Sequence, residues 1–67
     1  MKSVIKICEI KTSNDISNIQ KAIASNEGVI ACEVSLKRKE VQIIYDENFV
    51  NIDKIIDSIE NIGYMVI

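Results

Sequence analysis

The stretch GVIACEVSLKRKEVQIIYD, residues 28–46, carries the pattern that decides the fold. Alternate positions in both of its halves are apolar: Ile30, Cys32, Val34 and Leu36, then Val41, Ile43 and Tyr45. A period of two indicates half-buried β-strands, and Cys32 is expected to be buried as a small hydrophobic residue. The charged residues KRKE (37–40) separate the halves, so we predict an antiparallel hairpin with a solvated basic tip.

A helix is predicted before the hairpin. Ile16, Ile19 and Ile23 recur at helical spacing and give this segment one apolar face. Its entrance, Thr12-x-x-Asp15, has the pattern of a capping box, in which a hydroxyl and a carboxylate satisfy free backbone amides. Gly28 stands where the helix is expected to stop, because glycine adopts the left-handed conformation at low cost.

A second helix is predicted after the hairpin. Asn51 is a good cap, and the residues that follow it place isoleucines on one face: Ile52, Ile55, Ile56, Ile59 and Ile62. Gly63 is expected to end this helix, and the last four residues, YMVI (64–67), are predicted to form a short strand.

The first strand is expected between Ser3 and Ile10, with Ile5 and Ile7 facing the core. The element order is therefore β-α-β-β-α-β over residues 1–67, a single domain. We predict an α+β, ferredoxin-like βαββαβ sandwich with a four-stranded antiparallel sheet and two helices on one face.

Composition excludes several functions. The 67 residues contain no histidine, so His-based metal sites and Ser-His-Asp or Cys-His catalysis are excluded, and we expect no enzyme. A net charge of −2, with no aromatic residue on the predicted open face of the sheet, argues against nucleic acid. The chain shows neither a signal peptide nor an apolar run of ~18 residues, so we expect a cytoplasmic protein without a membrane segment.

The whole chain resembles the heavy-metal-associated domain family, found in small copper chaperones, mercury-binding proteins and copper-transporting ATPases, and its second half matches closely. The matching segments are GVIACEVSL (28–36), VQIIYD (41–46) and IDKIIDSIENIGY (52–64). Members commonly read G-V-x-x-V-x-V-x-L, V-x-V-x-Y-D and a helix ending in I-x-x-x-G-Y. The resemblance covers nearly all of the chain, and it implies the same ferredoxin-like fold.

That family binds metal through a loop that reads G-M-x-C-x-x-C. This chain has no cysteine at either cysteine position of that loop. Aligned through the helix periodicity, Glu9 falls on the family Gly, Ile10 on the Met, Thr12 on the first Cys and Asp15 on the second. The two family thiolates bind Cu(I) or another soft ion, whereas Thr12 and Asp15 offer hard oxygen donors. The resemblance also implies that Tyr64 lies beside this degenerate loop.

A register shifted by one residue would place Ser13 and Ile16 at the cysteine positions. That shift moves Ile16 and Ile19 away from the buried face of the helix, so the first register is preferred. Neither register supplies a thiol.

Cys8 is predicted to lie on the open face of the sheet. It is interpreted either as an unpaired surface thiol or as an intermolecular contact, in a disulfide-linked homodimer or around a shared metal. An internal disulfide with Cys32 is not expected, because the two cysteines should face opposite sides of strands that a third strand separates.

These features predict a divergent heavy-metal-associated domain that lacks the CxxC thiolates and serves as a protein-binding or regulatory module in metal homeostasis. The expected partner is another domain of the same fold or a metal-transporting ATPase. One alternative is a working soft-metal chaperone with atypical ligands such as Cys8, and another is a small-molecule-sensing regulatory domain. No cofactor is expected beyond weak or intermolecular copper or zinc.

Overall fold

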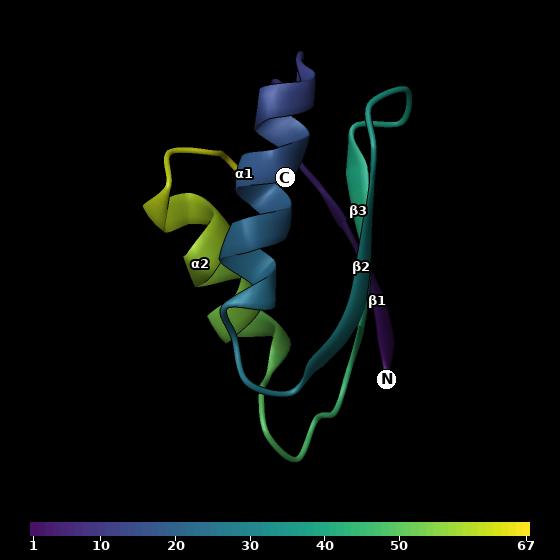
Figure 1. Ribbon diagram of the computed structural model, residues 1–67, viewed down its shortest axis with the longest axis vertical. Coiled ribbons are helices and arrows are strands. Elements are labelled where there is room, and N and C mark those ends of the chain that lie inside the picture. Colours follow the sequence, from purple (N-terminus) through teal and green to yellow (C-terminus); the bar gives the residue numbers. More distant parts are fainter.

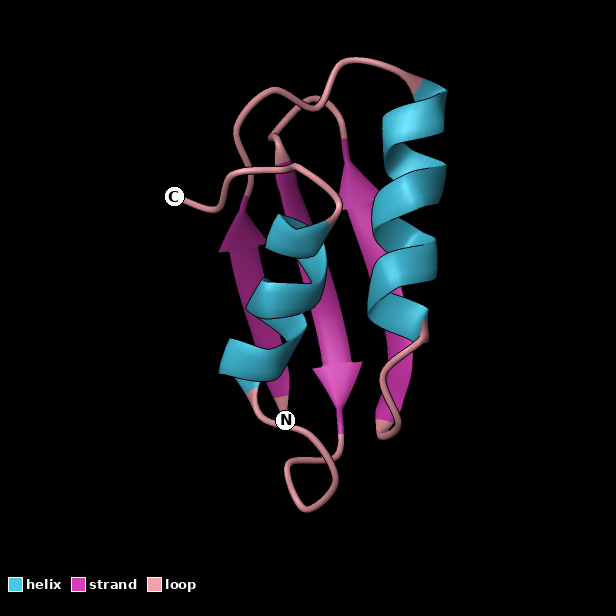
Figure 2. Cartoon of the chain, turned by 90° about the vertical axis from the view of Figure 1, so that its left-hand side faces the viewer, coloured by secondary structure: helices cyan, strands magenta, loops and turns pink.

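Two helices cover one face of an antiparallel sheet, as the sequence predicts (Figure 1). The computed structural model describes all residues from 1 to 67. The sheet has three strands in the order β1-β3-β2, and the helices lie side by side against it (Figure 2). The elements, in chain order, are β1 (Lys2–Lys6), α1 (Ser13–Ala24), β2 (Val29–Ser35), β3 (Glu40–Tyr45) and α2 (Ile52–Asn61).

The core fills the space between the sheet and the helices. Ile5 and Ile7 contribute from the first strand and its continuation, and Ile19, Ile23, Ile55 and Ile59 contribute from the helices. The remaining buried side chains are Ile10, Val41, Ile43, Tyr45 and Val50. Cys32 is half-buried rather than buried, and it packs against the rim of this core. Neither helix has the length and apolar character that a membrane crossing requires.

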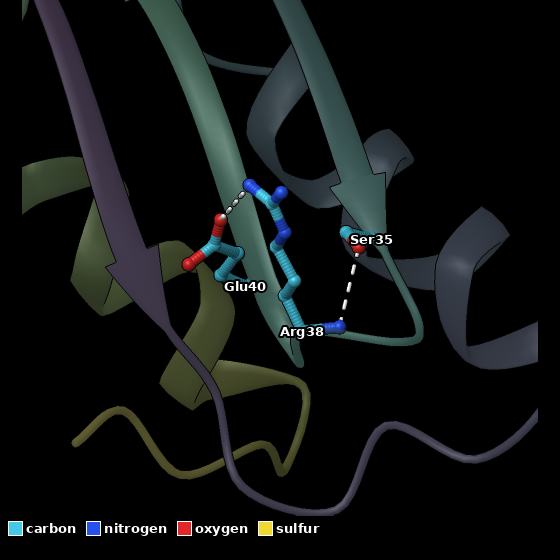
Figure 3. Close-up of polar contacts among 3 residues, drawn as sticks. All are labelled: Ser35, Arg38 and Glu40. Atoms are coloured by element: carbon cyan, nitrogen blue, oxygen red, sulfur yellow. Dashed lines mark hydrogen bonds and ion pairs between the residues drawn. The ribbon is translucent and has the colours of Figure 1, made fainter.

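The predicted hairpin is present, with Ser35 opposite Glu40 at its closed end. Within the turn, the Arg38 amide donates to Ser35 Oγ at 3.3 Å, and the Arg38 guanidinium lies 3.9 Å from Glu40 (Figure 3). The Arg38 side chain is 72% exposed, so this ion pair adds little stability. The basic run 37–39 is thus an exposed turn.

The prediction that Ile30 faces the core is wrong. Val29 pairs with Tyr45 and Ala31 pairs with Ile44, so Ile30 is an extra residue in a β-bulge. The bulge shifts the alternation by one position, which leaves Ile30 70% exposed and turns Val29 toward the core. Leu36, also predicted to face inward, lies in the turn and is 38% exposed.

The predicted fourth strand is reduced to a single antiparallel bridge between Ile7 and Val66. Two backbone hydrogen bonds, both 2.9 Å, flank the bridge: Cys8 N to Met65 O and Ile67 N to Lys6 O. Glu9 has a φ of 61°, so the chain leaves the extended conformation soon after β1. A longer ladder cannot form because its partner strand turns away.

The end of α1 differs from the prediction. α1 stops at Ala24, not near Gly28, because Ser25 Oγ and Asn26 Nδ2 donate to the carbonyl of Ala22, at 2.6 Å and 3.3 Å. These side chains satisfy a carbonyl at the end of the helix, which would otherwise lack a partner. Ile62 follows the end of α2 and is 45% exposed, so it does not join the buried isoleucine face.

Candidate functional site

The capping box predicted for Thr12 and Asp15 is present at the start of α1. The Asp15 amide donates to Thr12 Oγ1 at 3.2 Å, and Asp15 Oδ2 accepts from the amides of Thr12 and Lys11 at 3.1 Å and 2.9 Å. Thr12 has extended backbone angles, as an N-cap residue should. A cap of this kind typically contributes ~1 kcal/mol to stability.

Tyr64 reaches this capping box from the end of α2. Gly63 has a φ of 98°, and the amides of Gly63 and Tyr64 donate to the carbonyls of Glu60 and Ile59, at 3.0 Å and 3.4 Å. This is the hydrogen-bond pattern of a Schellman motif, which glycine permits because it lacks a Cβ. The motif directs the Tyr64 side chain toward α1, where its hydroxyl donates to Asp15 Oδ1 at 2.5 Å.

Asp15 and Tyr64 shift each other's pKa in opposite directions. The Tyr64 hydroxyl, followed by the amides of Lys11 and Thr12, holds the pKa of Asp15 below 3.8, because these donors favour the carboxylate. The same hydrogen bond raises the pKa of Tyr64 above 10.0, because ionisation would remove the donated proton. The pair is therefore stable as carboxylate and neutral phenol around pH 7.

The other degenerate loop positions have structural roles. Ile10, at the position of the family Met, is 2% exposed and belongs to the core. Glu9, at the position of the family Gly, is exposed and has a positive φ.

The helix entrance does not suit a soft metal ion. Its possible ligands are the hydroxyl of Thr12 and the carboxylate of Asp15, and all three of these oxygens already accept hydrogen bonds. Cu(I) is selected by thiolate and thioether sulfur. No group of three or more His, Cys, Asp or Glu side chains in the structure is placed to hold a metal.

Both cysteines are free thiols, and the strand order places β3 between β1 and β2, as expected. Burial raises the pKa of the Cys32 thiol. Cys8 is half-buried and lines a pocket beside the loop with Glu9, Gly63, Tyr64 and Met65. The sequence alone did not predict that Met65 lies beside Cys8, because the two residues are far apart in the sequence. The strand predicted over residues 64–67 was the one feature that could have indicated this contact.

The sequence of this chain matches a known protein family. The sequence model of the family called "Heavy-metal-associated domain" matches residues 14–65, from the first turn of α1 through Met65. The chain belongs to the heavy-metal-associated domain family. The predicted family is thereby confirmed, although the match begins after Thr12 and leaves most of the degenerate loop outside it.

One relative of this heavy-metal-associated domain is the copper chaperone CopZ of Staphylococcus haemolyticus (strain JCSC1435). It is 38% identical over 48 residues, which cover 72% of this chain and 71% of that protein. Relatives of this kind are metal-handling domains rather than enzymes.

Among solved structures, a CopZ metallochaperone has a TM-score of 0.97 over 100% of both chains, and its 24% identity supports the fold alone. The yeast copper transporter domain Ccc2a, described in apo and Cu(I)-loaded states, is 26% identical, with a TM-score of 0.90 over 97% of this chain and 89% of that one. Apo-CopP from Helicobacter pylori is 25% identical, with a TM-score of 0.90 over 100% of both chains.

The hydrogen bond between Tyr64 and Asp15 predicts a specific pH dependence. The pKa of folded Asp15 lies below 3.8, so its contribution is present above that pH and is lost as the pH falls through the folded value. The pKa of folded Tyr64 lies above 10.0, so its contribution is present below pH 10.0 and is lost as the pH rises through the folded value.

We therefore expect the stability difference between wild type and Tyr64→Phe to be largest near neutral pH and to shrink at both extremes. In the variant, the pKa of Asp15 should rise toward 3.8, as a ¹³C carboxyl NMR titration would show. An unchanged Asp15 titration in Tyr64→Phe would contradict the hydrogen bond.

Proposed function

We propose that this chain is a divergent heavy-metal-associated domain in which the start of α1 stabilises the fold instead of capturing metal. The observation that carries the proposal is the capping box, in which Thr12 and Asp15 are joined to each other and Asp15 is joined to Tyr64. Oxygen atoms committed to these bonds are poor replacements for two soft thiolates. Ligation by Asp15 would also compete with its hydrogen bonds to Tyr64 and to the amides of Lys11 and Thr12.

In this proposal the domain works in the cytoplasm, without catalysis, as a protein-binding or regulatory module in metal homeostasis. Its partner is another domain of the same fold, such as the metal-binding domain of a transporting ATPase. The fold supports this choice, because the similar structures include the N-terminal domain of a potential copper-translocating P-type ATPase from Bacillus subtilis. That domain has a TM-score of 0.92 with this chain at 18% identity, so the shared feature is the fold.

The experiment is an NMR titration of the ¹⁵N-labelled chain with the heavy-metal-associated domain of a copper-transporting ATPase from the same genome. We expect amide shifts confined to one face and saturation without added metal. The matched control is an unrelated ferredoxin-like domain of similar charge, which should cause no shifts. Absence of shifts at millimolar partner, or shifts that require a metal ion, would contradict a metal-independent docking role.

A metal-binding alternative is favoured by a single observation, the free thiol of Cys8 beside the degenerate loop. In the simplest form of this alternative, two Cys8 thiols from a homodimer share one copper or zinc ion. Sedimentation of the reduced protein with and without metal tests it, since only this arrangement requires two chains for each ion.

A further inference from the structure

Two sulfur-bearing side chains meet where the end of the chain crosses the continuation of β1. Ile7 and Val66 form the antiparallel bridge, and the Cys8 amide donates to the Met65 carbonyl at 2.9 Å. Cys8 and Met65 are thus joined by one backbone hydrogen bond, one residue beyond the bridge on each segment. Both residues line the same pocket, which places their side chains on one side of this crossing.

The surroundings leave both sulfurs accessible. Cys8 and Met65 line one pocket of about 340 Å³ together with Glu9, Gly63 and Tyr64. Met65 is 67% exposed, and Cys8 is a half-buried free thiol. The exposed Glu9 carboxylate at the rim adds negative charge, which favours a cation.

We propose that Cys8 Sγ and Met65 Sδ together bind one soft monovalent cation, Cu(I), in this pocket. Thiolate and thioether are soft donors, which Cu(I) prefers over hard oxygen ligands. In a linear two-coordinate arrangement, two sulfurs on one ion lie about 4.6 Å apart if each bond is near the ~2.3 Å of a zinc–sulfur bond. The Met65 side chain can adjust to that span, because methionine is unbranched and flexible.

Binding is a simple exchange of a proton for the metal. The Cys8 thiol releases its proton to solvent, the thiolate forms one bond to Cu(I), and the Met65 thioether donates a lone pair to form the second. No electron is transferred, and no further reactant is needed.

This site differs from the degenerate loop at the start of α1. Tyr64 lies between the two: its hydroxyl donates to Asp15, while the residue also lines the pocket of Cys8 and Met65. The inference goes beyond the docking role and does not depend on it, so either can fail alone.

The test uses the reduced full chain with Ag(I) and Cu(I), and with methionines labelled in the ε-¹³C methyl group. The chain has two methionines, Met1 and Met65, so Met1 is an internal control. We expect one ion per monomer, a shift of the Met65 methyl signal and none at Met1. Cys8→Ser should abolish the shift, Met65→Leu should weaken binding by about tenfold, equivalent to about 1.4 kcal/mol, and Cys32→Ser should change neither result.

Four outcomes would overturn the proposal. The first is one ion for each two chains with the Met65 methyl signal unmoved, which assigns the metal to an intermolecular Cys8 pair. The second is unchanged binding in Cys8→Ser, and the third is no binding at all in competition with a Cu(I) chelator. We expect Asp15→Asn to leave the metal affinity unchanged. The fourth outcome is a loss of metal affinity in this variant, which would assign the ion to the α1 entrance.

Discussion

Replacing Thr12 and Asp15 by cysteine is expected to create a tight Cu(I) site at the start of α1. These residues occupy the N-cap and the third helical position, and in the capping box each side chain bonds to the backbone amide of the other. A helix N-terminus lowers the pKa of a cysteine thiol, so both new sulfurs should be present as thiolates. We expect Cu(I) affinity at this position to rise at least about a thousandfold, which corresponds to about 4.1 kcal/mol.

The double variant is best made in a Cys8→Ala/Cys32→Ala background, so that every thiol counted is a new one. Competition with a colorimetric Cu(I) chelator gives the affinity, and native mass spectrometry gives the stoichiometry. Thr12→Ser with Asp15→Ser is the matched control with oxygen in place of sulfur, and its Cu(I) affinity should not increase. Ser13→Cys with Ile16→Cys tests the register shifted by one residue. Tight binding by that pair, and not by the first, would show that the alignment of the loop is wrong.

Gly28→Ala is expected to cause a large loss of stability. Gly28 has a φ of 96°, and a Cβ added there would lie 2.7 Å from Phe49 Cβ and 3.2 Å from Val50 Cγ1. The left-handed backbone costs an alanine about 1–2 kcal/mol, and forced overpacking costs about 1–3 kcal/mol more. At about 0.05–0.15 kcal/mol per residue, a chain of 67 residues has only about 3–10 kcal/mol in total.

Gly63→Ala is the matched control for this experiment. Gly63 has a φ of 98°, but a Cβ added there would meet no atom within 4 Å. Urea denaturation should therefore show a smaller loss of stability in Gly63→Ala than in Gly28→Ala, because only backbone strain acts at Gly63. Equal losses in the two variants would mean that the contact with Phe49 has no energetic effect.

Local patterns in the sequence were sufficient for much of the fold. Thr12-x-x-Asp15 predicted a capping box, the isoleucines after Asn51 predicted α2, and the alternation in residues 41–45 predicted β3. Each depends on residues within a few positions of one another. The relation to the heavy-metal-associated domain followed from three segments, residues 28–36, 41–46 and 52–64.

The failures concern features that depend on distant segments. The bulge at Ile30 follows from pairing with β3, and periodicity inside β2 cannot reveal it. The fourth strand shrank to one bridge because Glu9 turns the chain away from β1. The contact between Cys8 and Met65 joins opposite ends of the chain, so the sequence around either residue cannot predict it.

The claim that the start of α1 has lost soft-metal capture is tested most directly by a thiol-free chain, Cys8→Ala with Cys32→Ala. This variant keeps Thr12, Asp15 and Tyr64, and therefore the whole hydrogen-bonded entrance. In a Cu(I) titration against a competing chelator, we predict that the chelator retains all of the copper. Retention of one equivalent of Cu(I) by the protein, removed again by Asp15→Asn, would contradict the account.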